Sequence, residues 1–361
     1  MLKPAVITMV MLATPALAQQ TSVDAAARAA GVDAVARAGG ADYLAAEKGV
    51  GLSIGMVRDG KFTTWHFGSV AKGGPAPTDA TAWEIGSISK TITSLLLARA
   101  VVAGKASLDD DVRKYLDGDW PNLQFGGEPV RLLHLANMTS ALPDNLPDLS
   151  GLKDDPGRFR MAKALAAYGK ADFLADLRKV SPGKRPGDEV AHSNVAAQLL
   201  IYLVERIYGE PYQALLAREI EKPLGFAAGA SATGYDAEGV EAAVLPRDRF
   251  GWRYSMADML RYAALQLNEK DPAVALSHKG SWFTLDKKTA VALNWIVTEL
   301  PGGGRQLRTS GGTFGFSSVV QLYPERGLAI VLLANRSTPT AQGKLSEIAG
   351  RIVEAAGPPA Q

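Results

Sequence analysis

Segments with the pattern of β-strands lie at both ends of this 361-residue chain and are scarce in its middle. Near the N-terminus, residues 50–58 and 61–67 predict a β-hairpin with an Asp59-Gly60 turn. Near the C-terminus we expect four more strands, followed by a helix at 341–356; the strands are at residues 292–300, 306–310, 316–323 and 328–335. Because a strand is stable only beside other strands, this distribution predicts one antiparallel sheet built by both ends together.

The middle of the chain predicts helices and loops rather than strands. Short helices are expected after the Ser107–Asp111 cap and at residues 130–136, and Ser193 or Asn194 could cap a longer helix at 195–208. An alanine-rich helix at 25–38 is expected to be interrupted or bent at Gly31. We therefore predict an α/β fold of the α+β type, with the antiparallel sheet flanked by helices. In this scheme, residues 19–105 and 285–361 form an α/β domain into which an all-helical domain, residues 106–284, is inserted.

The first eighteen residues have the pattern of a secretory signal peptide. Lys3 supplies the positive charge, residues 5–12 are apolar, and Ala16-Leu17-Ala18 resembles a cleavage site before Gln19. No later segment approaches the ~20 apolar residues of a membrane span, so no integral membrane segment is expected after leader removal. The net charge of +2 offers no electrostatic argument for a nucleic-acid partner. The sequence thus predicts an exported, periplasmic protein.

One Ser-x-x-Lys tetrad, Ser87 to Lys90, lies where it could perform chemistry. Three others are embedded in Gly/Pro-rich loops, whereas Ser87 opens an apolar helix, Thr91–Ala103, that stops at Gly104. Lys90 lies one helical turn after Ser87, and a desolvated lysine can be neutral enough to take the proton of a serine hydroxyl. The alternative is a structural helix start whose lysine extends toward solvent.

A second serine motif, Gly51-Leu52-Ser53-Ile54-Gly55, matches the nucleophile elbow of α/β-hydrolases. That elbow requires a strand-to-helix turn that exposes the serine. Here strand character continues on both sides of Ser53 and a hairpin follows, so no catalytic role is expected for it.

Two later segments extend the Ser87 pattern. Ala191-His192-Ser193-Asn194 runs into an apolar helix, and Thr309-Ser310-Gly311-Gly312 lies in an expected strand. In order with Ser87–Lys90, they resemble the three signature motifs of the serine β-lactamase and penicillin-binding protein superfamily. The resemblance is greatest to the class C β-lactamase branch, with its D-alanyl-D-alanine peptidases and carboxylesterases, and it covers essentially the whole chain after the leader.

The resemblance implies a role for each matching position. Ser87 matches the acylated nucleophile and Lys90 the residue that helps deprotonate it. The backbone N–H groups of Ser87 and Gly312 match the oxyanion hole, which must face the developing negative charge. Substrate-binding positions are expected at Asn194, Thr309, Ser310 and Gly311. No cofactor is implied.

Two positions depart from the family pattern. His192 replaces the usual tyrosine, and is interpreted either as a general base and acid or as a helix-start histidine in a backbone hydrogen bond. The main base could therefore be His192 or Lys90. Thr309 replaces the usual lysine or histidine, and the adjacent Arg308 should face the other side of its strand. The remaining histidines show no metal-ligand spacing, so no metal site is expected.

These observations predict an exported serine hydrolase that forms an acyl-enzyme on β-lactam or D-Ala-D-Ala type amides. The alternatives are a carboxylesterase of the same fold, or a catalytically weak peptidoglycan- or peptide-binding module. The expected partner is a small amide or ester: a β-lactam, a muropeptide or a short ester.

Overall fold

The computed structural model describes residues 15–152, 154–247 and 250–358. Residues 1–14 of the predicted leader lie outside this range, and the helix α1 begins at Pro15. Within the described residues, no helix combines the length and the apolarity needed to cross a membrane.

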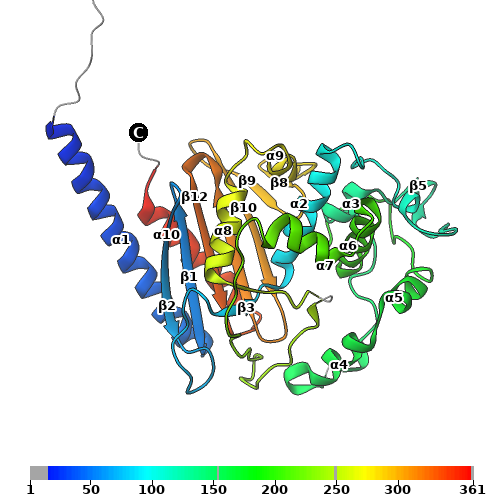
Figure 1. Cartoon of the computed structure of the whole chain (residues 1–361), viewed down its shortest axis with the longest axis horizontal. Coiled ribbons are helices and arrows are strands. Elements are labelled where there is room, and N and C mark those ends of the chain that lie inside the picture. The colour runs from blue at the N-terminus through cyan, green and yellow to red at the C-terminus, as the bar shows by residue number, and fades with distance from the viewer. Residues whose placement is uncertain (1–14, 153, 248–249, 359–361) are drawn as a thin grey trace, which may run out of the picture.

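An eight-stranded antiparallel sheet forms the centre of the described chain (Figure 1). Its strands follow the order β2-β1-β12-β11-β10-β9-β8-β7, so the first hairpin pairs with the last strand of the sequence. The bounds are β1 (Gly51–Arg58), β2 (Lys61–Gly68), β7 (Trp282–Phe283), β8 (Thr289–Val291), β9 (Ile296–Glu299), β10 (Arg305–Gly312), β11 (Ser317–Tyr323) and β12 (Leu328–Ala334). This arrangement confirms the predicted α/β fold, with an antiparallel sheet built by both ends of the chain.

Helices predominate between the two groups of strands. The helices of the whole molecule are α1 (Pro15–Glu47), α2 (Ser89–Val102), α3 (Leu132–Ala136), α4 (Phe159–Ala167), α5 (Lys170–Leu177), α6 (Asn194–Tyr208), α7 (Tyr212–Leu216), α8 (Met256–Gln266), α9 (Pro272–His278) and α10 (Ala341–Ala356). Two short ladders also occur there: β3 (Ala82–Glu84) with β6 (Arg253–Ser255), and β4 (Gln124–Phe125) with β5 (Glu128–Pro129). The exact domain boundaries, at residues 105 and 285, remain a prediction.

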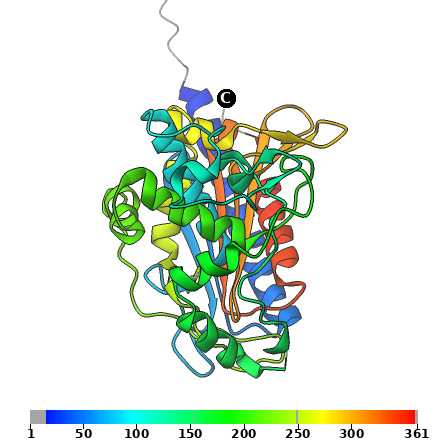
Figure 2. The same ribbon diagram turned by 90° about the vertical axis from the view of Figure 1, so that its right-hand side faces the viewer.

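Both faces of the sheet are covered, because side chains alternate along each strand. Ile330 and Leu332 of β12 belong to a core shared with α1 and α10, whereas Val331 and Leu333 belong to the core shared with α2, α6 and α8. Figure 2, which faces the side of the middle helices, shows them in front of the sheet. The C-terminal end of α10 also meets α1 within its length, since Arg28 lies against Gly357.

The hairpin β1–β2 forms as expected around Asp59 and Gly60, which both adopt positive φ angles. Ser53 lies within β1, is fully buried, and shares a 2.8 Å hydrogen bond between its Oγ and His66 Nδ1. A substrate could not reach this hydroxyl, so the second serine motif is structural.

Two local predictions were wrong. The strand expected at residues 292–300 begins only at Ile296, as β9, because residues 292–295 form the turn that leads back from β8, with Asn294 at a φ of 59°. The Asn294 side chain fixes this turn by donating to Ser94 Oγ of α2 at 2.8 Å. Helix α1 continues through Gly31, where no neighbouring atom requires a glycine and one glycine costs a helix only ~1 kcal/mol.

Candidate active site

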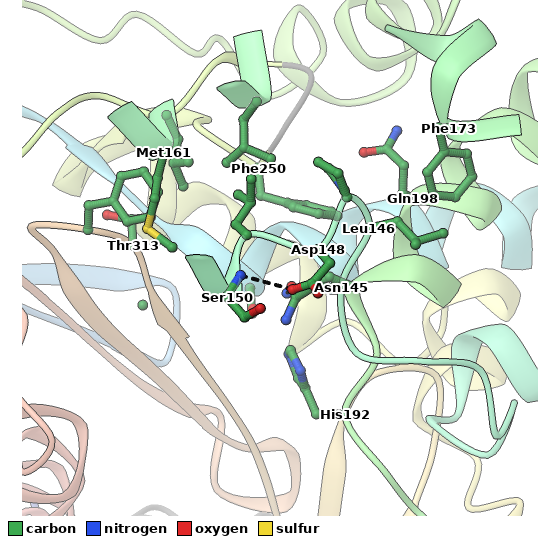
Figure 3. A pocket seen from close by; sticks show the side chains of 18 of the residues that line it. Asn145, Leu146, Asp148, Ser150, Met161, Phe173, His192, Gln198, Phe250 and Thr313 are labelled. Carbon is green, nitrogen blue, oxygen red and sulfur yellow. Dashed lines mark hydrogen bonds between the residues drawn. The ribbon is translucent and has the colours of Figure 1, made fainter. Parts of the chain in front are cut away.

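The three predicted motifs converge on one cavity of about 720 Å³. Ser87 enters it from the turn before α2, His192 and Asn194 enter from the start of α6, and Ser310 and Gly312 enter from β10. Figure 3 shows His192 at one end of this cavity, with Met161 and Phe173 toward the other. Segments more than two hundred residues apart in sequence therefore form a single site.

Glycines allow the serine turn to pack directly on β10. Gly86 has a φ of 52°, and a Cβ at this position would lie 2.7 Å from the backbone nitrogen of Gly312. A Cβ at Gly311 would lie 2.0 Å from the carbonyl oxygen of Ile85, so no side chain fits there either. The backbone N–H groups of Ser87 and Gly312, the two predicted oxyanion donors, thus belong to directly adjacent segments.

Lys90 is buried beneath the cavity and bonds to the start of α6. Its Nζ lies 2.8 Å from His192 Nε2 and donates to Asn194 Oδ1 at 2.8 Å. The Phe250 ring lies over it, with the ring centroid 5.6 Å from Nζ. Burial lowers the pKa of Lys90 to about 8, against a smaller opposing effect of the Asp144 carboxylate. About a tenth of this lysine is therefore neutral at pH 7, compared with well under a thousandth at the usual pKa of 10.5.

Asp144 is a member of the site that the sequence did not indicate. Its Oδ1 lies 2.6 Å from His192 Nδ1. Because an ionised carboxylate only accepts hydrogen bonds, Nδ1 carries the proton and the Nε2 lone pair faces Lys90. The sequence signal was faint: Asp144 directly follows Thr139-Ser140-Ala141-Leu142-Pro143, a stretch that also resembles the family.

The loop that carries Asp144 is tied to the first turn of α6. The backbone N–H of Asn194 donates to the carbonyl of Asp144 at 2.8 Å, and Ser193 Oγ donates to the carbonyl of Pro143 at 2.7 Å. Asn194 Nδ2 also donates to Asn145 Oδ1 at 2.8 Å. Ser193 caps α6 as well, accepting from Ala196 N at 3.0 Å, so one serine fixes both the helix start and the loop.

This geometry orients the Lys90 amine. A neutral amine has two N–H groups and one lone pair. His192 Nε2 and Asn194 Oδ1 can accept from the two N–H groups, which leaves the lone pair for a proton from Ser87. The chain Asp144–His192–Lys90 can therefore hold a lysine in the form that a general base requires.

Only alternate residues of the third motif face the cavity, because neighbouring side chains of a strand point to opposite sides. Ser310 and Gly312 line the cavity, whereas Thr309 and Gly311 do not. Arg308 is exposed and shares the strand face of Ser310, but it does not line the cavity. Among residues 15–152, 154–247 and 250–358, those that line the cavity include neither lysine nor arginine, and Asp148 is the one carboxylate. Among the described residues, no cluster of His, Cys, Asp and Glu is placed to hold a metal.

The chain is similar to known proteins over most of its length. The family model "Beta-lactamase" matches residues 32–353. A beta-lactamase of Pseudomonas fluorescens is 26% identical over 345 residues, covering 81% of this chain and 90% of the relative. The D-alanyl-D-alanine-carboxypeptidase/endopeptidase AmpH of Escherichia coli K12 is 24% identical, covering 73% of each chain. The crystal structure of a beta-lactamase/D-alanine carboxypeptidase from Pseudomonas syringae superposes with a TM-score of 0.75 at 21% identity, covering 91% of this chain and 99% of that one.

Proposed function

This chain belongs to the beta-lactamase family of serine hydrolases, and from that premise we propose that it is an exported enzyme that forms an acyl-enzyme at Ser87. The observation that carries the proposal is the buried Lys90 amine, which lies one turn after Ser87 and is held by His192 and Asn194. The substrates proposed are amides of the β-lactam or D-Ala-D-Ala type. The predicted leader supports a periplasmic location.

The proposed reaction begins with proton transfer from the Ser87 hydroxyl to neutral Lys90. The Ser87 oxygen attacks the substrate carbonyl carbon, and the backbone N–H groups of Ser87 and Gly312 hold the resulting oxyanion. Collapse of this intermediate breaks the bond to the leaving group. The leaving group takes a proton that passes from Lys90 through His192, whose imidazolium form is stabilised by Asp144. Water then attacks the acyl-enzyme, releases the acid and restores Ser87.

The test is covalent labelling followed by mass spectrometry. The protein should gain the mass of a penicillin, a nitrophenyl ester acyl group or a fluorophosphonate, each mapped to Ser87. Ser87→Ala should abolish labelling, with the melting temperature nearly unchanged because Ser87 is only partly buried. Labelling that persists in the Ala variant would refute the assignment. Absence of labelling in the wild type by all three reagents would favour the binding-module alternative.

A carboxylesterase is the second candidate, and the composition of the cavity wall favours it. In the family, a cation at the position of Thr309 helps to hold the substrate carboxylate, and here no lysine or arginine is found among the described residues that line the cavity. A hydrogen bond to a charged group contributes roughly 1.5–3 kcal/mol, or about ten- to a hundredfold in binding. Thr309→Lys should therefore improve hydrolysis of penicillins selectively over neutral esters. Efficient penicillin hydrolysis by the wild type, lost in Arg308→Gln, would show instead that Arg308 binds the carboxylate.

A further inference from the structure

Helix α4 covers the cavity without packing into the protein core. None of its nine residues, Phe159–Ala167, is buried. Met161 and Leu165 lie one turn apart, and both line the cavity. A helix of this length normally depends on packing of its apolar face, yet here that face meets a cavity.

The wall opposite Ser87 is apolar and carries little charge. Six apolar side chains surround the part of the cavity under α4: Leu146, Leu149, Met161, Leu165, Phe173 and Phe250. Phe173 of α5 is fully buried and gives this part a rigid floor. Asp148 also lines the cavity, and its carboxylate accepts from Ser150 N at 2.9 Å. A carboxylate on a ligand would lose its hydration against the apolar side chains, which is costly when no partner replaces the water.

One neutral polar group at this floor has no partner in the part of the chain that the structure describes. Gln198 of α6 is almost fully buried and lines the cavity, and no described residue forms a hydrogen bond with its Oε1. A buried amide oxygen left without a donor costs about 1–3 kcal/mol. A water molecule or a donor on a bound ligand would satisfy it, so this floor is built to contact a ligand.

We propose that the cavity under α4 is a subsite for an uncharged, mainly apolar acyl group of the substrate. The inference rests on the proposed acyl-enzyme at Ser87. Asn145 and Asn194 line the cavity with Ser87, and the acyl group attached to Ser87 extends past them between Leu165 and Phe173. The preferred substrates are then esters or amides of hydrophobic acids.

The experiment uses nitrophenyl esters of increasing acyl length, from acetyl to octanoyl, with the full-length exported protein. Each buried methylene should raise kcat/KM about three- to fourfold until the subsite is filled. A succinyl ester, which ends in a carboxylate, should react at least tenfold more slowly than the butyryl ester. Leu165→Glu should flatten the dependence on acyl length. Lys163→Glu, an exposed position of the same helix that does not line the cavity, should preserve it.

Three outcomes would overturn the subsite. In the first, kcat/KM depends on acyl length in the same way in Leu165→Glu and Lys163→Glu. In the second, the succinyl ester is hydrolysed faster than the butyryl ester. In the third, a matched series of acetate esters shows that kcat/KM depends on the length of the alcohol and not on that of the acyl group. Fluorophosphonate labelling of Ser87 in every variant separates these results from failure of the proposed function. Because α4 buries no residue, both variants should keep the wild-type melting temperature, which circular dichroism checks.

Discussion

Asp144 and His192 are 48 residues apart in the chain and still form the shortest link of the proposed proton path. The motifs identified Ser87, Lys90, His192 and Asn194 because each occupies a fixed place on a helix or at its start. Asp144 could not be identified in this way, because it lies in a loop whose course is set by backbone contacts with α6. Loop residues positioned by tertiary contacts carry no periodicity that a sequence pattern could show.

Asp144 should matter only while residue 192 is a histidine. Asp144→Asn removes the charge that stabilises the His192 imidazolium, so kcat/KM should fall about ten- to a hundredfold. In a His192→Tyr background, where no tautomer has to be fixed, the same change should cost less than about twofold. Steady-state kinetics of the four proteins measures this coupling.

The chain offers a matched control for that cycle. Asp79 lies 3.0 Å from His66 Nε2 and is 59% exposed, compared with 54% for Asp144, but its partner His66 does not line the cavity, whereas His192 does. Asp79→Asn should leave kcat/KM unchanged. Equal losses in both histidine backgrounds would mean that Asp144 supports only the loop.

The pH dependence should identify the base. Burial lowers the pKa of Lys90 to about 8, and the reaction needs its neutral form. We therefore expect kcat/KM to rise with pH and to level off above about 8. If kcat/KM instead falls on acidification through pH ~6–7, and His192→Phe removes this fall, then His192 is the base.

At the scale of elements, the alternation of apolar and polar residues, together with the glycines in the turns, predicted β10, β11, β12 and α10 closely. The prediction was wrong where one side chain decides the backbone path. At Asn294 the chain turns because the asparagine amide bonds to Ser94 two hundred residues earlier, a contact that no local pattern contains. The predicted helix before Leu116 is a single 3₁₀ turn, Val112–Tyr115, capped by Asp111.

Glu269 joins three elements beside the sheet. Its carboxylate lies 2.8 Å from Nδ1 of His278, the last residue of α9, and 2.6 Å from Nη2 of Arg305, the first residue of β10. The hydrogen bond with His278, and then the one with Arg305, lower the pKa of Glu269 to about 2. Glu269→Gln should therefore reduce the free energy of unfolding at pH 7 by about 1–3 kcal/mol.

The lowered pKa of Glu269 also sets the pH range in which this difference in the free energy of unfolding should appear. A carboxyl with a lowered pKa stabilises the fold above its usual value of 4.5 and loses this contribution as pH falls toward about 2. Urea unfolding of wild type and Glu269→Gln should give a difference that shrinks over this interval. Glu299→Gln, an exposed carboxylate at the end of β9, is the control and should show little difference at any pH.

At the scale of the whole molecule, the predicted leader should be removable without loss of structure. Among the α1 residues whose side chains the structure describes, from residue 28 onward, the core contacts begin at Val32, well after the expected cleavage site before Gln19. Intact-mass measurement of exported protein should give a chain that begins at Gln19, and Ala18→Trp should block this processing. Secreted material that retains Met1 would contradict the assignment.

The contact between Arg28 and Gly357 places the end of α10 beside α1, so a chain shortened to begin at Arg28 would have its two ends together on the side of the sheet away from the middle helices. A linker of a few residues could therefore join them, and new ends could be opened at the exposed Gly302-Gly303 turn before β10. That turn precedes Arg305, whereas Gly312 is at the other end of the strand, roughly 25 Å away at ~3.4 Å per residue. Such a circularly permuted enzyme should keep its catalytic cavity intact. Its two new ends would be attachment points for a surface or a fusion partner, far from the path of the substrate.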